Sequence, residues 1–460
     1  MTTNSAAGSP GSSVSAKSAP LDLPDDFVWG VSTSSYQIEG AARDDGRGPS
    51  VWDLFCRQQG RIANGDTGDV ACDHYHRFKE DVELMRNLGV AAYRFSVAWP
   101  RVLARGRGKA NEPGLDFYDR LIDALLAAGI EPWLCLYHWD LPQALEDLGG
   151  WTNRDIAGWF ADYAALVARR YGDRVKRFAT FNEPSVFTMF GYVFGGGAPG
   201  IVDGPAYYRS VHHVNLAHGA AADVLRSAVP RSLIGAVHNR QPCHPASGKP
   251  EDAVAAGLFD EHWNRAFPDP QHFACYPPSI ATAIEPYLKA GDMARIARPM
   301  DWFGFNHYSP IYAKADASSP LGFGWGGPPD DAPRSGVGWH IQPDAFRDEL
   351  LSTYNRYRLP IYVTENGFGS SDDRPNAAGE IIDQGRIDYL DAYTRAMSVA
   401  IRSGANVRGY FVWSLLDNFE WGSGYGNRFG LVYVDFATQR RIPKASARWY
   451  AKLIGGAGAG

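Results

Sequence analysis

The sequence predicts an α/β protein, a single (β/α)8 TIM barrel with long βα loops. Short apolar runs recur along the chain, and segments with helical spacing separate them. The runs are continuously apolar rather than alternating, which is typical of parallel strands buried on both faces. Successive units of strand and helix define this barrel. The eight expected strands span residues 27–32, 91–99, 131–139, 177–183, 233–239, 302–308, 360–365 and 407–416.

The segments between the runs carry the pattern of helices that pack on a sheet. Residues 77–89 have apolar side chains at helical spacing, namely Phe78, Val82, Met85 and Leu88. The pattern stops at Gly89, and glycine is the residue that most readily ends a helix in the left-handed conformation. Residues 115–129 repeat the pattern and stop at Gly129. Both segments therefore lead into the next expected strand.

Two segments lie outside this repeat. Residues 318–338 are polar and rich in Gly and Pro, and we expect a loop over the barrel mouth rather than a linker. Residues 1–20 are rich in Ser, Ala and Gly without an apolar run, so we expect a disordered tail before a folded domain over residues 21–456. An open doubly wound sheet is the alternative topology, but no glycine fingerprint follows the first strand.

The composition excludes several classes of protein. Of 460 residues, 45% are hydrophobic and 21% are charged, which is typical of a soluble globular chain. A net charge of −6 without blocks of like charge disfavours a nucleic-acid partner, and no apolar run is long enough to span a membrane. The five cysteines have no C-x-x-C spacing, which disfavours a disulfide framework or a zinc ribbon. Because the first residues also lack the apolar stretch of a signal peptide, we expect a cytoplasmic protein that binds a small neutral molecule.

Polar and aromatic residues gather where the expected strands end, and in a closed parallel barrel these ends meet at one rim. In chain order they are Gln37, Arg94, His138, Asn182, Glu183, Asn306, Tyr308, Glu365, Trp413, Glu420 and Trp421. Each has an ordinary alternative, since a glutamate before proline often begins a helix and a histidine often lies in a core. Their joint placement predicts a site, and Glu183 with Glu365 supplies the two carboxyl groups that glycosidic bond hydrolysis requires. The 14 tryptophans favour the same chemistry, because sugar C–H faces stack on flat rings.

Six ordered segments carry a resemblance to a known family. They are residues 27–30 (FVWG) with 36–40 (YQIEG), 93–96 (YRFS), 137–142 (YHWDLP), 180–184 (TFNEP), 364–367 (TENG) and 413–421 (WSLLDNFEW). On these segments the chain resembles the family 1 glycoside hydrolases, the β-glucosidase family, from about residue 27 to residue 450. The resemblance implies that residues 21–456 form a catalytic domain that needs neither a cofactor nor a metal.

The resemblance also implies a role for each rim residue. Glu183 is the acid/base and Glu365 the nucleophile of a retaining mechanism. The substrate-binding residues are Gln37, His138, Asn182, Tyr308, Trp339, Trp413, Glu420 and Trp421. The supporting residues are Arg94, Asn306, Trp139 and Phe429.

The chemistry of the two carboxyl groups agrees with these roles. In a retaining enzyme they lie roughly 5 Å apart and resist ionising together. We therefore expect a proton on Glu183, while Arg94 and the Tyr308 hydroxyl keep Glu365 charged. Once Glu365 is esterified its charge disappears, so that Glu183 becomes more acidic and can deprotonate the incoming water.

The residues at a few individual positions narrow the range of expected substrates. Relatives that hydrolyse 6-phosphoglycosides carry Ser, Lys and Tyr where this chain has Glu420, Asn427 and Phe429, and we expect Glu420 to repel the phosphate. Plant thioglucosidases carry Gln where this chain has Glu183. Glu420 can bridge the 4- and 6-hydroxyls of glucose, and often those of galactose or fucose.

Two residues depart from the family pattern, and two histidine motifs raise the question of a metal. Ser185 stands where many relatives have Trp, and His307 where they usually have Tyr, so the shape around the acid/base and the aglycone preference stay open. Residues 73–76 (DHYH) and the pair His212-His213 have ligand-type side chains. The first motif recurs in the family without metal, so we expect none.

The sequence therefore predicts a retaining, exo-acting β-glucosidase for cellobiose, short cello-oligosaccharides and aryl β-glucosides, with a part in cellulose degradation. A broad β-galactosidase or β-fucosidase and a transglycosidase of the same family remain alternatives. A non-catalytic glycan-binding barrel is the alternative from another class.

Overall fold

The computed structural model describes residues 21–457 and contains a closed barrel of eight parallel strands. Around the barrel they follow chain order, and the last pairs with the first. They are β1 (Val28–Ser32), β2 (Ala92–Ser96), β3 (Glu131–Cys135), β4 (Arg177–Asn182), β5 (Leu233–Asn239), β7 (Trp302–Asn306), β10 (Ile361–Asn366) and β11 (Val407–Trp413). The eight expected strands and the barrel are confirmed. β2 and β3 end earlier than expected, because the chain leaves the sheet there for loops that include α4 (Trp99–Val102).

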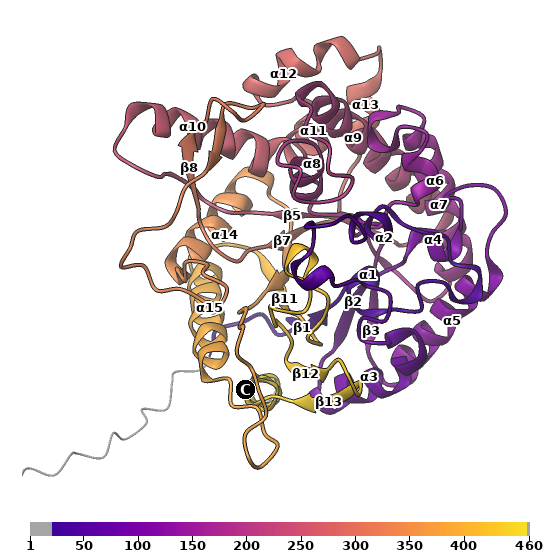
Figure 1. Ribbon diagram of the computed structural model, residues 1–460, viewed down its shortest axis with the longest axis vertical. Coiled ribbons are helices and arrows are strands. Elements are labelled where there is room, and N and C mark those ends of the chain that lie inside the picture. The colour runs from indigo at the N-terminus through magenta and orange to yellow at the C-terminus, as the bar shows by residue number, and fades with distance from the viewer. Residues whose placement is uncertain (1–20, 458–460) are drawn as a thin grey trace, which may run out of the picture.

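The longer helices surround the barrel (Figure 1). They are α3 (His74–Leu88), α5 (Glu112–Ala127), α7 (Ile156–Tyr171), α9 (Gly204–Ala228), α14 (Pro343–Tyr357), α15 (Gln384–Arg402) and α16 (Ala445–Ala457). The two helices expected from the sequence correspond to α3 and α5, and Gly89 and Gly129 follow them with φ of 75° and 74°. These positive angles explain why glycine stands at both positions.

Shorter elements occupy the loops. The helices are α1 (Ser35–Ile38), α2 (Val51–Phe55), α6 (Gln143–Glu146), α8 (Pro184–Tyr192), α10 (Pro250–Asp260), α11 (Pro268–Phe273), α12 (Pro278–Ile284) and α13 (Asp292–Ile296). A 3-10 turn, η6 (Trp421–Ser423), follows β11.

Two small sheets lie outside the barrel. β6 (Cys243–Pro245), β8 (Ile311–Ala315) and β9 (Phe323–Trp325) form one, and β12 (Val432–Asp435) pairs with β13 (Arg440–Pro443) in the other. β9 lies inside residues 318–338, where a loop was expected. It is ordered there because Phe323 is fully buried with its ring centroid 4.8 Å from that of Phe259.

The inside of the barrel is a packed core rather than a pore. A separate cluster of buried side chains comes from the barrel strands, namely Ala92, Trp133, Cys135, Ala179, Val237, Trp302, Tyr362 and Phe411. Trp133 lies at its centre, with ring centroids 4.8 Å from Tyr362 and 5.0 Å from Phe411. This filling closes the interior below the rim where the strands end.

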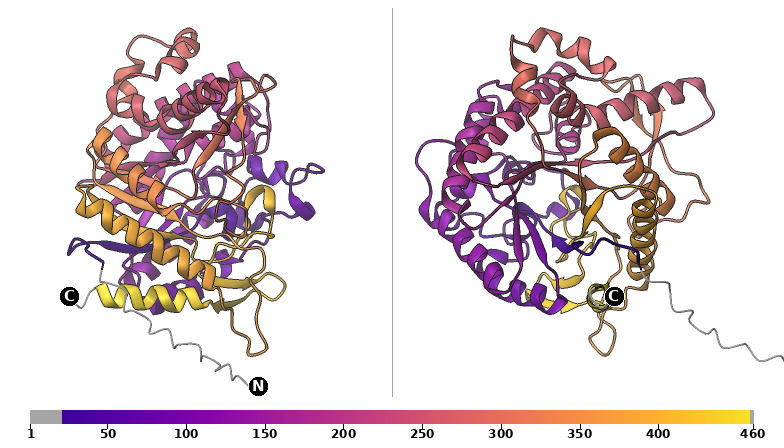
Figure 2. Two further views of the ribbon diagram at one scale, coloured as in Figure 1. Left: turned by 90° about the vertical axis from the view of Figure 1, so that its left-hand side faces the viewer. Right: turned by 180° about the vertical axis from the view of Figure 1, so that it is seen from behind.

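The ends of the described chain lie on one side of the molecule, where α15 and α16 run next to each other (Figure 2). The backbone N–H of Asp22 donates to the Ser398 hydroxyl of α15 at 3.0 Å. The tail expected over residues 1–20 lies outside the described residues. Within residues 21–457, no helix combines the length and apolar character that crossing a membrane requires.

Candidate active site

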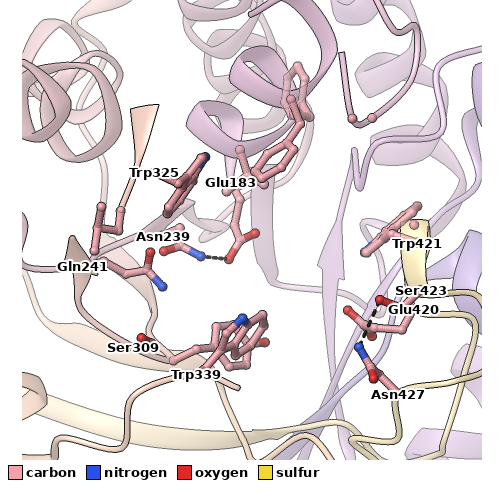
Figure 3. Close-up of a pocket in the computed structure, with 18 of the residues that line it drawn as sticks. Glu183, Asn239, Gln241, Ser309, Trp325, Trp339, Glu420, Trp421, Ser423 and Asn427 are labelled. Atoms are coloured by element: carbon pink, nitrogen blue, oxygen red, sulfur yellow. Dashed lines mark hydrogen bonds between the residues drawn. The ribbon is translucent and has the colours of Figure 1, made fainter. Parts of the chain in front are cut away.

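A cavity of about 570 Å³ opens where the barrel strands end, and most of the predicted site residues line it. These are His138, Trp139, Glu183, Tyr308, Trp339, Glu365, Trp413, Glu420, Trp421 and Phe429. The other predicted residues, Gln37, Arg94, Asn182 and Asn306, lie behind the lining, almost fully buried. Figure 3 shows Glu183 between two regions of the cavity. We call the region of Glu365, Trp413 and Glu420 the inner half, and the region of Gln241, Trp325 and Trp339 the outer half.

The carboxyl group of Glu365 receives a donor on each oxygen. Arg94 Nη1 donates to Oε1 at 2.6 Å, and the Tyr308 hydroxyl donates to Oε2 at 2.8 Å. Burial raises the pKa of Glu365, while the positive charge of Arg94 and both hydrogen bonds oppose the rise. Because both oxygens accept, these two donors stabilise the ionised form against the effect of burial.

Glu183 lies in a different environment. Burial, followed by the negative charge of Glu365, raises the pKa of Glu183 to about 8. Asn239 Nδ2 and Asn306 Nδ2 both donate to Oε1, at 2.7 Å and 2.9 Å. No hydrogen bond within residues 21–457 involves Oε2, which is therefore free to carry the proton. The backbone of Glu183 has φ of 46°, a left-handed conformation that a glutamate adopts only when its surroundings impose it.

Amide and guanidinium groups connect the two carboxyl groups. Asn182 Oδ1 accepts from Arg94 Nη2 at 2.6 Å and from Asn306 Nδ2 at 3.1 Å. A continuous path therefore runs from Glu365 through Arg94, Asn182 and Asn306 to Glu183. The strand register places Asn306 beside Glu365 on the neighbouring strand. The barrel thus holds both carboxyl groups in one rigid network.

His138 supplies a free donor to the cavity. Asn182 Nδ2 lies 3.0 Å from His138 Nε2, and because the Asn182 oxygen already accepts two bonds, its nitrogen is the donor. Burial holds the pKa of His138 well below its usual range, so the ring is neutral with its proton on Nδ1. Nδ1 is a buried donor that has no partner among the described residues.

Glu420 lies just before η6 and lines the inner half. Gln37 Nε2 donates to Glu420 Oε2 at 3.3 Å. Burial and the charges of Glu365 and Glu183 raise the pKa of Glu420 to about 8, so that it is largely protonated at neutral pH. The repulsion of a 6-phosphate by Glu420 stays a prediction. A further feature disfavours phosphate, because no Lys or Arg is present among the described residues that line the cavity.

Aromatic rings complete the inner half. The ring of His138 stacks on those of Trp413 and Trp421, with centroids 5.8 Å and 6.1 Å away. Trp421 also packs on Trp139 at 4.5 Å and on Trp52 of α2 at 4.5 Å. These contacts fix the orientation of the Trp421 indole beside Glu420 (Figure 3).

Several lining residues were not predicted from the sequence. Asn239, which donates to Glu183, ends β5 and could have been found from its place at the end of an expected strand. Gln241 lies two residues beyond that end, and Trp325 belongs to β9, where a loop was expected. The aromatic residues Phe187, Phe190 and Trp263 join Trp325 in the outer half.

The residues that depart from the family pattern are buried beside the cavity, but neither is among its lining residues. Ser185 is in the first turn of α8, and His307 Nδ1 lies 2.6 Å from the carbonyl oxygen of Arg240. Their effect on the shape around the acid/base and on the aglycone preference stays open.

The two histidine motifs make contacts within the protein. His74 Nδ1 lies 2.7 Å from Asp81 Oδ2, and His76 Nδ1 lies 2.6 Å from Asp73 Oδ1. His212 Nε2 lies 2.9 Å from an oxygen of Asp292. Throughout residues 21–457, no group of three or more ligand-type side chains is arranged to hold a metal ion.

Comparison with known proteins places this geometry in one family. The family model described as "Glycosyl hydrolase family 1" matches residues 20–459. Beta-glucosidase A of Thermotoga maritima is 45% identical, over 94% of this chain and 97% of that protein. The 1,4-beta-D-glucan glucohydrolase of Thermotoga neapolitana is 44% identical, over 94% of this chain and 98% of that protein. The structure of beta-glucosidase from Thermotoga maritima in complex with glucoimidazole has a TM-score of 0.90 at 44% identity, covering 95% of this chain and 99% of that chain.

Proposed function

This chain belongs to glycosyl hydrolase family 1, and we propose that it is a retaining β-glucosidase that releases terminal non-reducing β-D-glucosyl residues by double displacement. The observation that carries the proposal is the unequal environment of two carboxyl groups in one network. Glu365 accepts from Arg94 and Tyr308, whereas Glu183 has a pKa of about 8 and a free oxygen. Glu365 is thus suited to act as the nucleophile, and Glu183 is suited to act as the acid that donates a proton.

We propose that the first half-reaction begins with attack of a Glu365 oxygen on the anomeric carbon. The bond to the leaving oxygen breaks as the Glu183 proton moves onto that oxygen, and a glycosyl ester of Glu365 remains. In the second half-reaction water attacks the anomeric carbon and gives its proton to Glu183, and the ester bond to Glu365 breaks. Loss of the Glu365 charge in the ester removes a cause of the raised Glu183 pKa, so that Glu183 can act as a base.

The residues of the inner half are proposed to recognise glucose. His138 Nδ1 and the Glu420 carboxyl supply hydrogen bonds to hydroxyl groups, and Trp413 offers a ring face to the pyranose. Trp421 adds an indole N–H. Asn182 and Gln37 lie behind the lining, so their proposed contact with the sugar requires that it reach the floor of the cavity.

The test is hydrolysis of a panel of glycosides by the purified protein. It comprises p-nitrophenyl β-D-glucoside, β-D-galactoside and β-D-fucoside together with cellobiose, with products followed by NMR from the first minute. We expect cleavage of the glucosides with β-glucose as the first product. First release of α-glucose would contradict the retaining mechanism, and absence of cleavage would favour a glycan-binding barrel. A higher kcat/KM for the galactoside or fucoside would establish the broader alternative, and disaccharide products from concentrated substrate would establish transglycosylation.

We further propose that residues 21–456 are the catalytic domain and that it acts in the cytoplasm on oligosaccharides from cellulose. The five cysteines are all free, which supports a reducing compartment. Fractionation of cells that express the full chain tests the location. Recovery of the activity with a cytoplasmic marker enzyme is expected, and recovery from the medium or periplasm would contradict it.

A further inference from the structure

We propose that the inner half opens to solvent beside Glu420, through a gap lined by Ser423 and Asn427, and that this gap accepts a second neutral sugar on the 6-oxygen of the bound glucosyl unit. The chain then cleaves 6-O-glycosylated β-glucosides and releases the disaccharide intact. The inference rests on the proposed β-glucosidase function and adds a substrate class to it. Figure 3 shows Ser423, Asn427 and Glu420 together, on the side of the cavity away from Gln241 and Trp325.

The gap exists because glycine stands at two exposed positions of the turn after β11. Gly422 lines the cavity, and Gly426 follows four residues later. A Cβ at Gly422 would meet no atom of the described chain within 4 Å, and one at Gly426 would meet only the Ser423 carbonyl oxygen, at 3.2 Å. Neither glycine has a positive φ. Since neither packing nor backbone conformation requires glycine here, their effect is to leave an opening in the wall beside Glu420.

Two polar side chains border the gap, and each has unused hydrogen-bonding capacity. Asn427 Nδ2 donates to the Ser423 hydroxyl oxygen at 3.0 Å (Figure 3). Within residues 21–457, no hydrogen bond involves Asn427 Oδ1, and none is donated by the Ser423 hydroxyl. The pair therefore offers an acceptor and a donor next to each other. Neighbouring hydroxyls of a sugar can match both, because each hydroxyl donates one hydrogen bond and accepts others.

The turn that carries this pair is held by the chain before α3. The backbone N–H of Tyr425 donates to Asp66 Oδ2 at 3.0 Å, and the Tyr425 hydroxyl donates to the Thr67 carbonyl oxygen at 2.7 Å. Ser423 and Asn427 lie two residues to either side of Tyr425. Their positions are therefore fixed before a ligand arrives, and little entropy is lost on binding.

The position and the charge of the gap select the kind of substituent. The 6-oxygen of glucose is on an exocyclic carbon, so it reaches further from the ring than the other hydroxyls. When the 4- and 6-hydroxyls face Glu420, a group on the 6-oxygen extends toward the residues next to Glu420. No Lys or Arg is present among the described residues that line the cavity, so an anionic group there finds no cation. A neutral sugar needs none.

The test uses p-nitrophenyl β-isomaltoside, in which an α-linked glucose is attached to the 6-oxygen of the β-glucosyl unit. A β-glucosidase does not remove an α-linked unit, so nitrophenol appears only if the whole disaccharide binds. The bond between the anomeric carbon and the nitrophenol oxygen breaks, Glu365 forms an ester with the isomaltosyl unit, and water then releases isomaltose. Nitrophenol is followed by absorbance and isomaltose by NMR.

Two substrates with the same leaving group are the controls for position and charge. p-Nitrophenyl β-maltoside carries the α-linked glucose on the 4-oxygen, and p-nitrophenyl 6-phospho-β-D-glucoside carries an anion on the 6-oxygen. We expect kcat/KM for the isomaltoside to lie within about tenfold of that for p-nitrophenyl β-D-glucoside, and at least about tenfold above the values for both controls.

Two substitutions test the gap itself, through the ratio of kcat/KM for the isomaltoside to that for the glucoside. Asn427→Ala removes the acceptor and should lower the ratio a few fold, as for one neutral hydrogen bond. Gly422→Phe places a ring in the gap and should lower it about tenfold or more. The matched control is Gly257→Phe in α10, at an exposed glycine outside the cavity lining whose Cβ would also meet no described atom within 4 Å. It should leave the ratio unchanged.

Ratios between substrates do not depend on the fraction of folded protein. The proposal is overturned if the glucoside is cleaved but the isomaltoside is not, if the maltoside is cleaved as well as the isomaltoside, or if Gly422→Phe leaves the ratio unchanged. An unchanged ratio in Asn427→Ala would overturn the role of its side chain. If the wild type cleaves none of the four substrates, the proposed function fails instead, so the two failures are distinguishable.

Discussion

The inner and outer halves of the cavity are built by opposite means. The inner half contains the buried carboxyl groups of Glu183 and Glu365 and the partly buried one of Glu420, and the pKa of each is raised. The outer half contains two exposed tryptophans, Trp325 and Trp339, and most of the polar side chains near them are already paired. The inner half therefore depends on electrostatics at fixed distances, whereas the outer half depends on contact area.

This difference has a consequence for stability. Burying acidic groups costs free energy unless cations and donors compensate, and among the described residues Arg94 is the only cation in contact with any of the three carboxyl groups. Stacking surfaces carry no such cost. Substitutions in the inner half should therefore change rate and stability together, while those in the outer half change the choice of substrate.

The largest expected effect is that of Glu365→Gly, which removes the proposed nucleophile from the inner half. We expect kcat to fall on the order of 10⁵-fold, because no covalent intermediate can form. Azide should restore turnover of an activated aryl glucoside and give α-glucosyl azide, since a small anion fits the space left by the side chain. Rescue with a β product, or no rescue in a folded protein, would contradict the role of Glu365. Rates and NMR of the product are the measurements.

Glu183 lies where the inner and outer halves meet. The effect of Glu183→Ala should therefore differ between substrates according to how much protonation their leaving groups need. A dinitrophenyl leaving group needs little protonation, whereas the glucose released from cellobiose needs it fully. We expect kcat/KM for cellobiose to fall about 10²- to 10⁴-fold and that for the dinitrophenyl glucoside far less. Equal losses for both substrates would argue against an acid role.

The raised pKa of Glu183 predicts how kcat/KM falls on the alkaline side of its pH profile. Glu183 must be protonated in the first step, and its pKa is about 8 in the free protein. The value of kcat/KM should therefore be retained below pH 8 and fall as the pH rises through about 8. In Glu183→Ala this alkaline limb should disappear, and its persistence would assign the limb to another group.

A third test disturbs the inner half from outside the cavity. Lys444 is buried, and Nζ donates to Asp417 Oδ1 at 2.7 Å and also to Asp373 Oδ2. Asp417 precedes Glu420 in the loop after β11. Lys444→Met removes one of the two cations paired with each carboxylate, while Arg428 stays on Asp417 and Arg386 on Asp373. We expect a loss of about 1.5–3 kcal/mol in the free energy of unfolding by denaturant, as for hydrogen bonds to a charged group. The exposed Lys289→Met is the control and should change it by less than about 0.5 kcal/mol.

Lys444→Met also tests how separate the halves are. It should weaken inhibition by glucose analogues that occupy the inner half, since the loop that carries Glu420 and Trp421 loses support. The ratio of kcat/KM for 4-methylumbelliferyl glucoside to that for cellobiose should change little, because Trp325 packs on Phe259 and Trp263 and only Trp339 contacts that loop, through Phe429. A changed ratio would show that the halves are coupled.

The two halves also differ in how far the sequence predicts them. The eight barrel strands were predictable because continuous apolar runs are typical of strands buried on both faces, and their ends bring Glu183 and Glu365 to one rim. The position of Trp325 was not predictable, since β9 exists only through the packing of Phe323 on Phe259 from a distant segment. The raised pKa of Glu420 likewise depends on burial that no local pattern reports.

The smallest expected effect concerns Asn239, which belongs to both halves. Its Nδ2 donates to Glu183 at 2.7 Å and so stabilises the ionised carboxylate, which lowers the Glu183 pKa. In Asn239→Ala this donor is lost, so the pKa should rise and the alkaline limb of kcat/KM should move to higher pH. The rate on cellobiose should fall by about tenfold or less, as expected for one hydrogen bond. Gln241→Ala, which does not touch Glu183, should leave the limb in place. If Asn239→Ala lowers the rate but the limb does not move, Asn239 acts by supporting the Trp263 indole of the outer half rather than by tuning the acid.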